Sequence, residues 1–363
     1  MFRSNALWVL IKSSALLLVA GAWMVQDGQG LSEPRVFHAA AQLADGRVLV
    51  TGGRGPGGSA SATGDLFNPK GSTWAAAAAM PAGRWGHTLT VLKDGRVLAV
   101  GSKGAVCAVF DPKVGTWSAG ATMNEDRYLH TATLLSDGRV LIAGGRNANT
   151  LASVEIYDPK TGKCSRGPDM AKPRYYHTAT LLKDGRVLVA GGIEDKNLDG
   201  QPYAHCEMFD PAAKAWKETG SLKTGRLWHG AERLEDGRVL VVGGYRRGRL
   251  ESCELFDPKS GVWTAAPALR EGRYDLATAL LRDGRVVAVA GATGDSTPSL
   301  SNSELFDPKA SKWSSGPAIK DARRTHTAWR LESDRVLVVG GWRGWGREPL
   351  SSAEILEPPS ESR

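Results

Sequence analysis

The sequence predicts an all-β fold: a seven-bladed β-propeller with four antiparallel strands per blade, closed into a ring by an N-terminal strand. Two observations carry this prediction. Repeats of this length with four strand-like runs each are typical of propellers, and the two ends of the repeat region complement each other. One phrase recurs seven times, 43 to 52 residues apart, and the arginine of its turn falls at Arg47, Arg96, Arg139, Arg186, Arg238, Arg285 and Arg335.

The first two strands of a blade are clearest in the copy that begins at Arg174. We expect strands over 177–182 and 186–190, on either side of Asp184-Gly185, a strong hairpin signal in which we expect positive φ at both residues. The second run, V-L-V-A, has no polar alternation, which predicts a strand buried on both faces. The Gly-Gly that follows allows a sharp turn or a close approach of another segment.

The third strand is expected over 206–209, where it ends at Asp210-Pro211, because proline cannot donate a hydrogen bond to a sheet. An aromatic residue on the predicted fourth strand follows six residues after the aspartate position. Its large apolar area predicts a wedge between neighbouring blades. These positions hold Trp74, Trp117, Trp216, Trp263 and Trp313, with Cys164 in the third copy.

The ends of the chain predict how the ring closes. The seventh copy reaches Glu357 and ends before a fourth strand can form, while the segment from Trp23 to Leu31 precedes the first copy without a blade of its own. We therefore expect this N-terminal segment to supply the outer strand of the last blade, which removes an open sheet edge.

Together, R-x-x-H, D-G-R-V-L-V-x-G-G, E-x-F-D-P and the trailing tryptophan resemble the Kelch repeat, from Trp23 to Pro359. The arrangement is similar to the propeller domain of galactose-oxidase-like proteins and to exported bacterial Kelch proteins. The resemblance implies a ring of four-stranded blades whose loops on one face are often used for binding.

Residues 1–22 differ from the repeats. They contain Arg3 and Lys12, no acidic residue, an apolar stretch and the triplet Ala20-Gly21-Ala22, which together indicate a secretory signal peptide. We predict that 23–363 form one exported propeller domain, secreted or periplasmic, monomeric, and without an integral membrane segment after cleavage. The net charge of +8 is spread over the repeats, and export makes nucleic acid an unsuitable partner.

Repetition argues against a catalytic role for the motif residues, because seven equivalent positions cannot all be catalytic. We expect the histidines to form structural hydrogen bonds and the repeated acids to pair with the arginines or with backbone amides. The histidines are His38, His87, His130, His177, His229 and His326, with Leu276 in the remaining copy. The acids are Asp65, Glu155, Glu207, Glu254, Glu304 and Glu354.

No nucleophile elbow, phosphate loop or C-x-x-C pair is present. Galactose-oxidase-like enzymes need a tyrosine cross-linked to cysteine and further ligands, and no cysteine here occupies a plausible counterpart, so we predict no copper site. Cys107, Cys206 and Cys253 share one register on separate blades, which predicts buried thiols too far apart to bridge. The sequence therefore predicts no cofactor, with calcium as the one exception.

The calcium candidate lies between the second and third strands of the fourth blade. Asp195, Asn197 and Asp199, followed by Gly200, match the first half of a calcium loop. The match is incomplete, because Cys206 stands where a ligating glutamate should be. A plain polar hairpin loop is the alternative.

Two sets of side chains are candidates for binding. Aromatic residues between the repeated Arg and His should either rim one face or pack between blades: Phe37, Trp85, Tyr128, Tyr175, Tyr176, Trp228 and Tyr274. Two loops between second and third strands should give neighbouring blades a basic and aromatic patch on the same face. This patch comprises Arg246, Arg247, Arg249, Trp342, Arg343, Trp345 and Arg347.

These features predict an exported, non-enzymatic protein that recognises a protein or polysaccharide through the variable loop face. The alternative is a secreted or periplasmic carbohydrate-active enzyme of the Kelch type. A pocket at the ring mouth that gathers the non-repeated acids Asp275, Glu194 and Asp195 would favour the enzyme.

Overall fold

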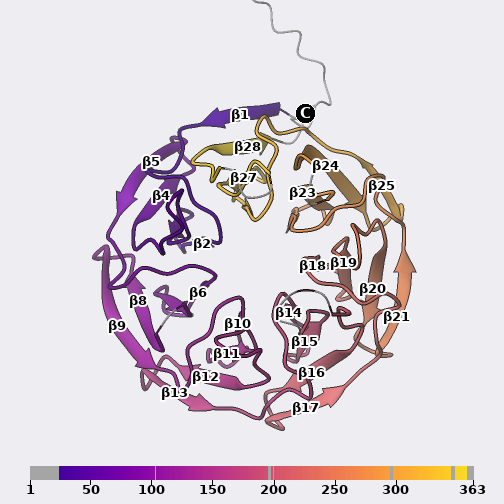
Figure 1. The fold of residues 1–363 in the computed structure, drawn as a ribbon, viewed down its shortest axis with the longest axis horizontal. Coiled ribbons are helices and arrows are strands. Elements are labelled where there is room, and N and C mark those ends of the chain that lie inside the picture. Colours follow the sequence, from indigo (N-terminus) through magenta and orange to yellow (C-terminus); the bar gives the residue numbers. More distant parts are fainter. Residues whose placement is uncertain are drawn as a thin grey trace, which may run out of the picture.

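The computed structural model describes residues 24–102, 104–194, 198, 200–294, 297–344 and 348–357. Over this part of the chain, seven four-stranded antiparallel sheets stand around a common axis, and each sheet is one blade (Figure 1). The predicted fold class is confirmed. The part of the chain that is described contains no helix long and apolar enough to cross a membrane.

The blades are numbered in chain order, with strands given from the axis outward. Blades 1 to 3 contain β2 (Ala39–Gln42), β3 (Val48–Thr51), β4 (Gly64–Asn68), β5 (Thr73–Ala77); β6 (Thr88–Val91), β7 (Val97–Val100), β8 (Val106–Asp111), β9 (Thr116–Thr122); and β10 (Thr131–Leu134), β11 (Val140–Ala143), β12 (Val154–Asp158), β13 (Lys163–Arg166). Blades 4 and 5 contain β14 (Thr178–Leu181), β15 (Val187–Ala190), β16 (Cys206–Asp210), β17 (Ala215–Glu218); and β18 (Gly230–Arg233), β19 (Val239–Val242), β20 (Cys253–Asp257), β21 (Val262–Ala266). Blades 6 and 7 contain β22 (Ala277–Leu280), β23 (Val286–Gly291), β24 (Leu300–Asp307), β25 (Lys312–Ser315); and β26 (Thr327–Arg330), β27 (Val336–Val339), β28 (Ala353–Glu357), β1 (Met24–Gly28).

The hairpin between the two inner strands of blade 4 forms where Asp184-Gly185 predicts it. The amide of Leu182 donates to the carbonyl oxygen of Arg186 (2.8 Å) and the amide of Gly185 donates to that of Leu182 (3.1 Å). Only Gly185 has positive φ, at 89°, so the expectation of positive φ at both residues is wrong. The loop instead ends in one left-handed residue, a common three-residue hairpin that needs glycine at a single place.

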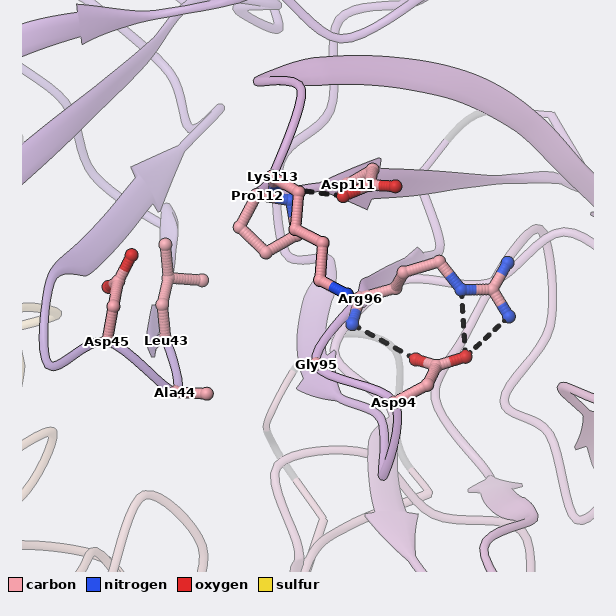
Figure 2. A pocket seen from close by; sticks show the side chains of 9 residues that line it. All are labelled: Leu43, Ala44, Asp45, Asp94, Gly95, Arg96, Asp111, Pro112 and Lys113. Atoms are coloured by element: carbon pink, nitrogen blue, oxygen red, sulfur yellow. Dashed lines mark hydrogen bonds and ion pairs between the residues drawn. The ribbon is translucent and has the colours of Figure 1, made fainter.

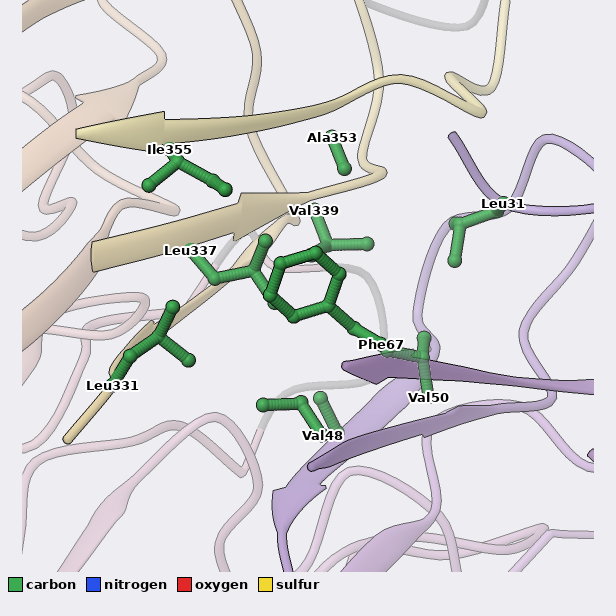
Figure 3. Close-up of a cluster of buried hydrophobic side chains, with 10 residues drawn as sticks. Leu31, Val48, Val50, Phe67, Leu331, Leu337, Val339, Ala353 and Ile355 are labelled. Carbon is green, nitrogen blue, oxygen red and sulfur yellow. The ribbon is translucent and has the colours of Figure 1, made fainter. Parts of the chain in front are cut away.

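The apolar core lies between blades. All residues of each second strand are buried, four in six blades and six in blade 6, as the V-L-V-A pattern predicts. In one such contact, Phe67 of blade 1 lies against Leu337 and Val339 of blade 7 (Figure 3). Full burial of a phenylalanine contributes roughly 1.5–3 kcal/mol. An apolar cluster lies between each pair of neighbouring blades and holds the two blades against each other.

The tryptophan on an outer strand is the predicted wedge. Trp216 packs against its own blade's Phe209, with ring centroids 5.2 Å apart, and joins a cluster that includes residues of blade 3. Its indole nitrogen donates to the carbonyl oxygen of Pro168 in the blade 3–blade 4 connection (2.8 Å). Trp117, Trp263 and Trp313 make the equivalent bond, so each of these four tryptophans ties its blade to the chain segment that leads into it.

The ring closes as the complementary ends predict. β1 pairs antiparallel with β28, with Val25 opposite Leu356, so the N-terminal strand is the outermost strand of blade 7 (Figure 1). The predicted signal peptide, residues 1–22, lies outside the described residues.

Candidate functional site

The connections between successive blades and those between second and third strands lie on one face, the loop-bearing face. Antiparallel bridges join the two kinds of connection within a blade, as between Val36 and Arg54, Leu227 and Tyr245, and Arg324 and Trp342. The expectation that these loops share a face is confirmed. Any site built from the variable loops must lie here.

A buried arginine anchors these connections in most blades. In blade 4, Arg174 donates through Nη1 to the carbonyl oxygen of Gly191 (2.8 Å) and through Nη2 to Oε1 of Glu207 (2.8 Å). Glu207 also accepts the amide of Ala171 (2.8 Å). Burial lowers the pKa of Arg174 and the carboxylate opposes that shift. The same ion pair is present in blades 1, 3, 5, 6 and 7, so the repeated acids are structural, as predicted.

Four of the repeated histidines, His38, His130, His177 and His229, hydrogen-bond to a threonine on the inner strand of the neighbouring blade. Nε2 of His177 lies 3.0 Å from Oγ1 of Thr131, and Nε2 of His229 lies 3.0 Å from Oγ1 of Thr178. Burial, together with Arg174, lowers the pKa of His177 to about 3, so the ring is neutral near pH 7. The predicted structural role of the histidines is confirmed at these positions.

Aromatic side chains surround the axis on the loop-bearing face. We call this set the aromatic girdle: Phe37, Trp85, Tyr128, Tyr175, Tyr176, Trp228, Tyr245, Tyr274 and Trp342. One arc runs from Trp342 through Phe37 and Trp85 to Tyr128, with successive ring centroids 5.9, 5.8 and 4.5 Å apart. A second arc joins Tyr175, Tyr176, Trp228, Tyr245 and Tyr274.

Two arginines contact rings of the girdle. The guanidinium of Arg146 lies 5.8 Å from the Tyr128 ring centroid and 5.0 Å from that of Tyr175, so it connects the arcs. Arg54 lies only 3.6 Å from the Trp85 ring centroid, a cation–π contact. No ion pair joins Arg54 to a carboxylate of the described residues, and its Nε has no hydrogen-bond partner among them.

The aromatic candidates from the sequence therefore divide. Tyr175 and Tyr274 are buried at 1% exposure and pack between loops, whereas Trp85, Tyr128 and Trp228 are half-buried at the surface of the face. Some of these aromatic residues therefore pack inside the molecule, and others lie at the surface of the loop-bearing face, so each of the two expectations holds for part of the set. Sequence reasoning missed Arg54, although its place directly after a Gly-Gly pair, where Tyr245 and Trp342 also stand, marks it as a face residue.

A hollow of about 570 Å³ opens on this face between blades 7 and 1. Trp342 and Arg54 line it, together with Glu348. Three prolines and a valine add apolar contact, and two glycines complete the lining: Pro34, Pro56, Pro349, Val36, Gly55 and Gly58. The hollow therefore combines an aromatic ring, a donor and an acceptor.

The predicted basic patch is not continuous. Its loops belong to blades 5 and 7, with blade 6 between them, so the expectation of neighbouring blades is wrong. Arg246, Arg247 and Arg249 are exposed on blade 5. Arg343 is exposed on blade 7, where its Nη2 lies 2.5 Å from Oδ1 of Asp321. Trp345 and Arg347, from the same predicted patch, lie outside the described residues.

The calcium-loop residues Asp195, Asn197 and Asp199 also lie outside the described residues. The non-repeated acids are engaged separately. Glu194 accepts a hydrogen bond from the Tyr203 hydroxyl (2.7 Å), and Asp275 accepts one from the Thr325 hydroxyl in the gap of the girdle between Tyr274 and Trp342. Burial raises the pKa of Asp275.

A second unusual carboxyl, missed from sequence, lies between the inner strands of blades 5 and 6. Glu232 accepts a hydrogen bond from the Thr278 hydroxyl (2.9 Å), and burial raises its pKa to about 7. The repeated threonine and histidine are replaced there by Gly230 and Leu276. That double departure is the sequence signal that marks this contact.

The opposite face carries hollows that repeat with the blades. One of about 430 Å³ lies between the inner hairpins of blades 1 and 2, where Arg96 folds back onto Asp94 with Nη2 2.7 Å from Oδ2 (Figure 2). Equivalent turns line hollows between blades 2 and 3 and between blades 3 and 4. Because the repeat itself generates them, they do not single out a site.

Comparison with known proteins supports the fold. A family model for the Kelch motif matches residues 127–171 and 236–270. A solved structure of a fungal alcohol oxidase of the AA5 family, in complex with copper, is similar with a TM-score of 0.76 and 17% identity, covering 94% of this chain and 77% of that one. No curated protein sequence matches.

The expectation of no cofactor except calcium is contradicted by this comparison, because the similar structure is in complex with copper. Among the described residues, however, no three His, Cys, Asp or Glu side chains gather where they could hold a metal ion. The His, Cys, Asp and Glu side chains of the described residues therefore do not fit a copper centre. We derive no chemical step through copper. The chain is therefore a seven-bladed β-propeller that contains matches to the Kelch motif.

Proposed function

We propose that this protein binds a carbohydrate chain on the loop-bearing face, anchored in the hollow between blades 7 and 1. The observation that carries the proposal is the lining of that hollow, where Trp342, Arg54 and Glu348 meet in about 570 Å³. A volume of this size lies in the range of small-ligand sites, which are largely apolar with a few placed polar groups.

The lining suits a sugar better than an ion. An aromatic ring offers a flat apolar surface for the C–H face of a sugar, while hydroxyl groups need both donors and acceptors. Arg54 supplies only donors and Glu348, when ionised, only acceptors. A simple anion would be repelled by Glu348 and a simple cation by Arg54, whereas a polyhydroxylated ring can bond to both.

The rest of the face offers room for a longer chain. The girdle continues from Trp342 through Phe37 to Trp85, with half-buried rings at each step. On blade 5, Arg246, Arg247 and Arg249 would favour acidic groups farther along the ligand. Export by the signal peptide at 1–22 would place a monomeric propeller where extracellular or periplasmic polysaccharide is found.

The test is binding of the purified protein to an array of neutral and acidic oligosaccharides, followed by titration of the best ligand. We expect Trp342→Ala and Arg54→Ala to weaken binding at least tenfold. Arg96→Ala, an arginine beside the hollow on the opposite face, is the matched control and should leave affinity unchanged. Equal affinity in all variants, or capture of proteins but no glycan, would overturn the proposal.

A second candidate function is oxidation of an alcohol or sugar with copper, favoured by the copper-containing alcohol oxidase of similar fold. It is tested by copper content after loading and dialysis, and by oxygen uptake with a panel of alcohols and sugars. Stoichiometric copper together with alcohol-dependent oxygen uptake would replace the binding proposal by an enzymatic one.

A further inference from the structure

Blade 2 lacks the carboxylate that neutralises the buried arginine in the other blades. Ala108 stands at the strand position of Glu155 and Glu207, and Pro81 stands where Asn124 donates its amide to Glu155 in blade 3. Proline has no amide hydrogen to offer. Acceptor and donor are therefore lost together, and Arg84 keeps its place without a counter-ion.

Arg84 is 5% exposed and donates through Nη1 to the carbonyl oxygen of Gly101 (2.7 Å) and through Nη2 to that of Val106 (2.6 Å). No carboxylate of the described residues lies within ion-pair distance of it, and its Nε has no hydrogen-bond partner among them. A buried cation with only neutral partners stabilises any nearby group that can become an anion.

That neighbouring group is the thiol of Cys107. Contact with the Cys164 thiol, and then the charge of Arg84, lower the pKa of Cys107. Two cysteines in the same register provide the contrast, because burial raises the pKa of both Cys206 and Cys253 to about 11. Their blades keep the arginine–glutamate pair, with Arg174 bound to Glu207 and Arg226 to Glu254.

Cys107 and Cys164 belong to different blades. Cys164 lies on β13 of blade 3, at the position where other blades carry the tryptophan wedge, and packs against the cluster that contains Cys107 of β8 in blade 2. Loss of the wedge thus brings two thiols into contact across the blade 2–blade 3 boundary. Both are free thiols in the structure, Cys107 buried and Cys164 half-buried.

We propose that Cys107 and Cys164 form a redox-active pair that closes to an inter-blade disulfide, with a small disulfide such as oxidised glutathione as the oxidant. The oxidant first exchanges with the more accessible Cys164, forming a mixed disulfide and releasing one reduced thiol. The Cys107 thiolate then attacks Sγ of Cys164, the mixed disulfide bond breaks, and the second reduced thiol leaves. Two electrons pass from the protein to the oxidant.

The disulfide would replace the missing wedge. At five of the other boundaries a tryptophan packs between neighbouring blades, and at the blade 6–blade 7 boundary Val25 takes that position. At the blade 2–blade 3 boundary the residue is Cys164. A covalent link between β8 and β13 would hold blades 2 and 3 together by restricting the unfolded chain. Reduction would loosen this one boundary and leave the other six unchanged.

The first test counts thiols in the denatured protein before and after treatment with oxidised glutathione. The sequence has four cysteines, and we expect the number of free thiols to fall from four to two, with Cys107 and Cys164 joined in one peptide by mass spectrometry. Cys206→Ser and Cys253→Ser are matched controls that should still lose two thiols. Cys107→Ser should stop at a glutathione adduct on Cys164, because no thiolate can resolve it.

The second test addresses Arg84 through its missing partner. Ala108→Glu restores the carboxylate of the other blades, so the resolving step should slow at pH 7 and its pH profile should move to higher pH. Cysteine variants keep the proposal testable if Ala108→Glu does not fold. Retention of all four thiols, pairing through Cys206 or Cys253, or an adduct that persists on Cys164 in the unmodified protein would overturn it.

Discussion

The hydroxyl of Thr278 in blade 6 donates a hydrogen bond to Oε1 of Glu232 in blade 5, across a boundary where the repeated histidine is absent (2.9 Å). At the other inner-strand boundaries described above, a neutral histidine meets a threonine. At the boundary between blades 5 and 6, the carboxyl group of Glu232 makes the polar contact between the two inner strands instead. Glu232 is half-buried, and a carboxyl without a cationic partner in such a place carries a cost that depends on pH.

Glu232→Gln should therefore change the pH dependence of stability. Burial raises the folded-state pKa of Glu232 to about 7, above the ~4.3 of an unfolded chain. Between about pH 4.3 and 7, Glu232 is protonated in more of the folded molecules than of the unfolded ones. The contribution of Glu232 to the free energy of unfolding is therefore fully present at low pH and is lost as pH rises through 7. The variant should be more stable than the original protein at pH 8, by roughly 3–4 kcal/mol, and close to it near pH 4.5.

The measurement is the urea midpoint as a function of pH. Glu235→Gln, an exposed glutamate of the same blade, is the control and should leave the profile unchanged. A constant offset between Glu232→Gln and the original protein at all pH values would show that the carboxyl does not titrate in this window.

The histidine links predict the opposite dependence. Burial lowers the folded-state pKa of His177 to about 3, below the ~6.5 of an unfolded chain. The unfolded state then binds more protons below pH 6.5, so this contribution to stability is full above 6.5 and is lost as pH falls toward 3. His177→Gln should flatten the decline of stability in acid, measured by thermal unfolding between pH 3 and 7.

His326 offers a matched comparison. Neither ring nitrogen of His326 has a hydrogen-bond partner among the described residues, because Ala277 takes the place of the threonine. His177→Gln should cost about 1 kcal/mol more than His326→Gln at pH 7, the usual contribution of one hydrogen bond. Equal costs would mean that the Thr131 contact contributes nothing to stability.

The fold was predictable because its signals are local and repeated. Asp184-Gly185 specifies a hairpin, V-L-V-A specifies a doubly buried strand, and Asp210-Pro211 ends one. Each signal needs only a few adjacent residues, and recurrence removes ambiguity. The predicted turn, with positive φ at both Asp184 and Gly185, was wrong, because only Gly185 has positive φ. Asp-Gly occurs in more than one type of hairpin, so these two residues alone do not specify the turn type.

The candidate site was less predictable because its contacts cross blade boundaries. Arg54 stacks on Trp85, which belongs to the next repeat, and no local pattern pairs them. Cys164 was recognised as a substitution for tryptophan, but its contact with Cys107 depends on how deeply blade 2 packs on blade 3. Departures from the repeat, such as Ala108 and Gly230, are the sequence signals that mark these places.

Replacement of the buried arginine of one blade should be far more costly than that of an exposed one. Arg174→Met leaves Glu207 buried at 1% exposure without its cation, and breaking a buried pair in this way costs about 3–5 kcal/mol. Arg96→Met removes an ion pair whose arginine side chain is 38% exposed, which costs about 0–1 kcal/mol. Urea unfolding of both variants measures the difference, and similar midpoints would contradict the anchoring role.

Removal of the closing strand should open the ring. Deletion of Met24–Gly28 leaves the backbone of β28 unpaired along its outer edge and removes Val25 from the cluster between blades 6 and 7. An exposed edge strand pairs readily with other chains, so we expect a lower melting temperature and concentration-dependent association, measured by calorimetry and light scattering. Gln26→Ala keeps the strand and changes only an exposed side chain, so it should remain monomeric with unchanged melting. A deletion variant that melts like the original protein would mean that the other hydrogen-bonded strands hold blade 7 in place without β1.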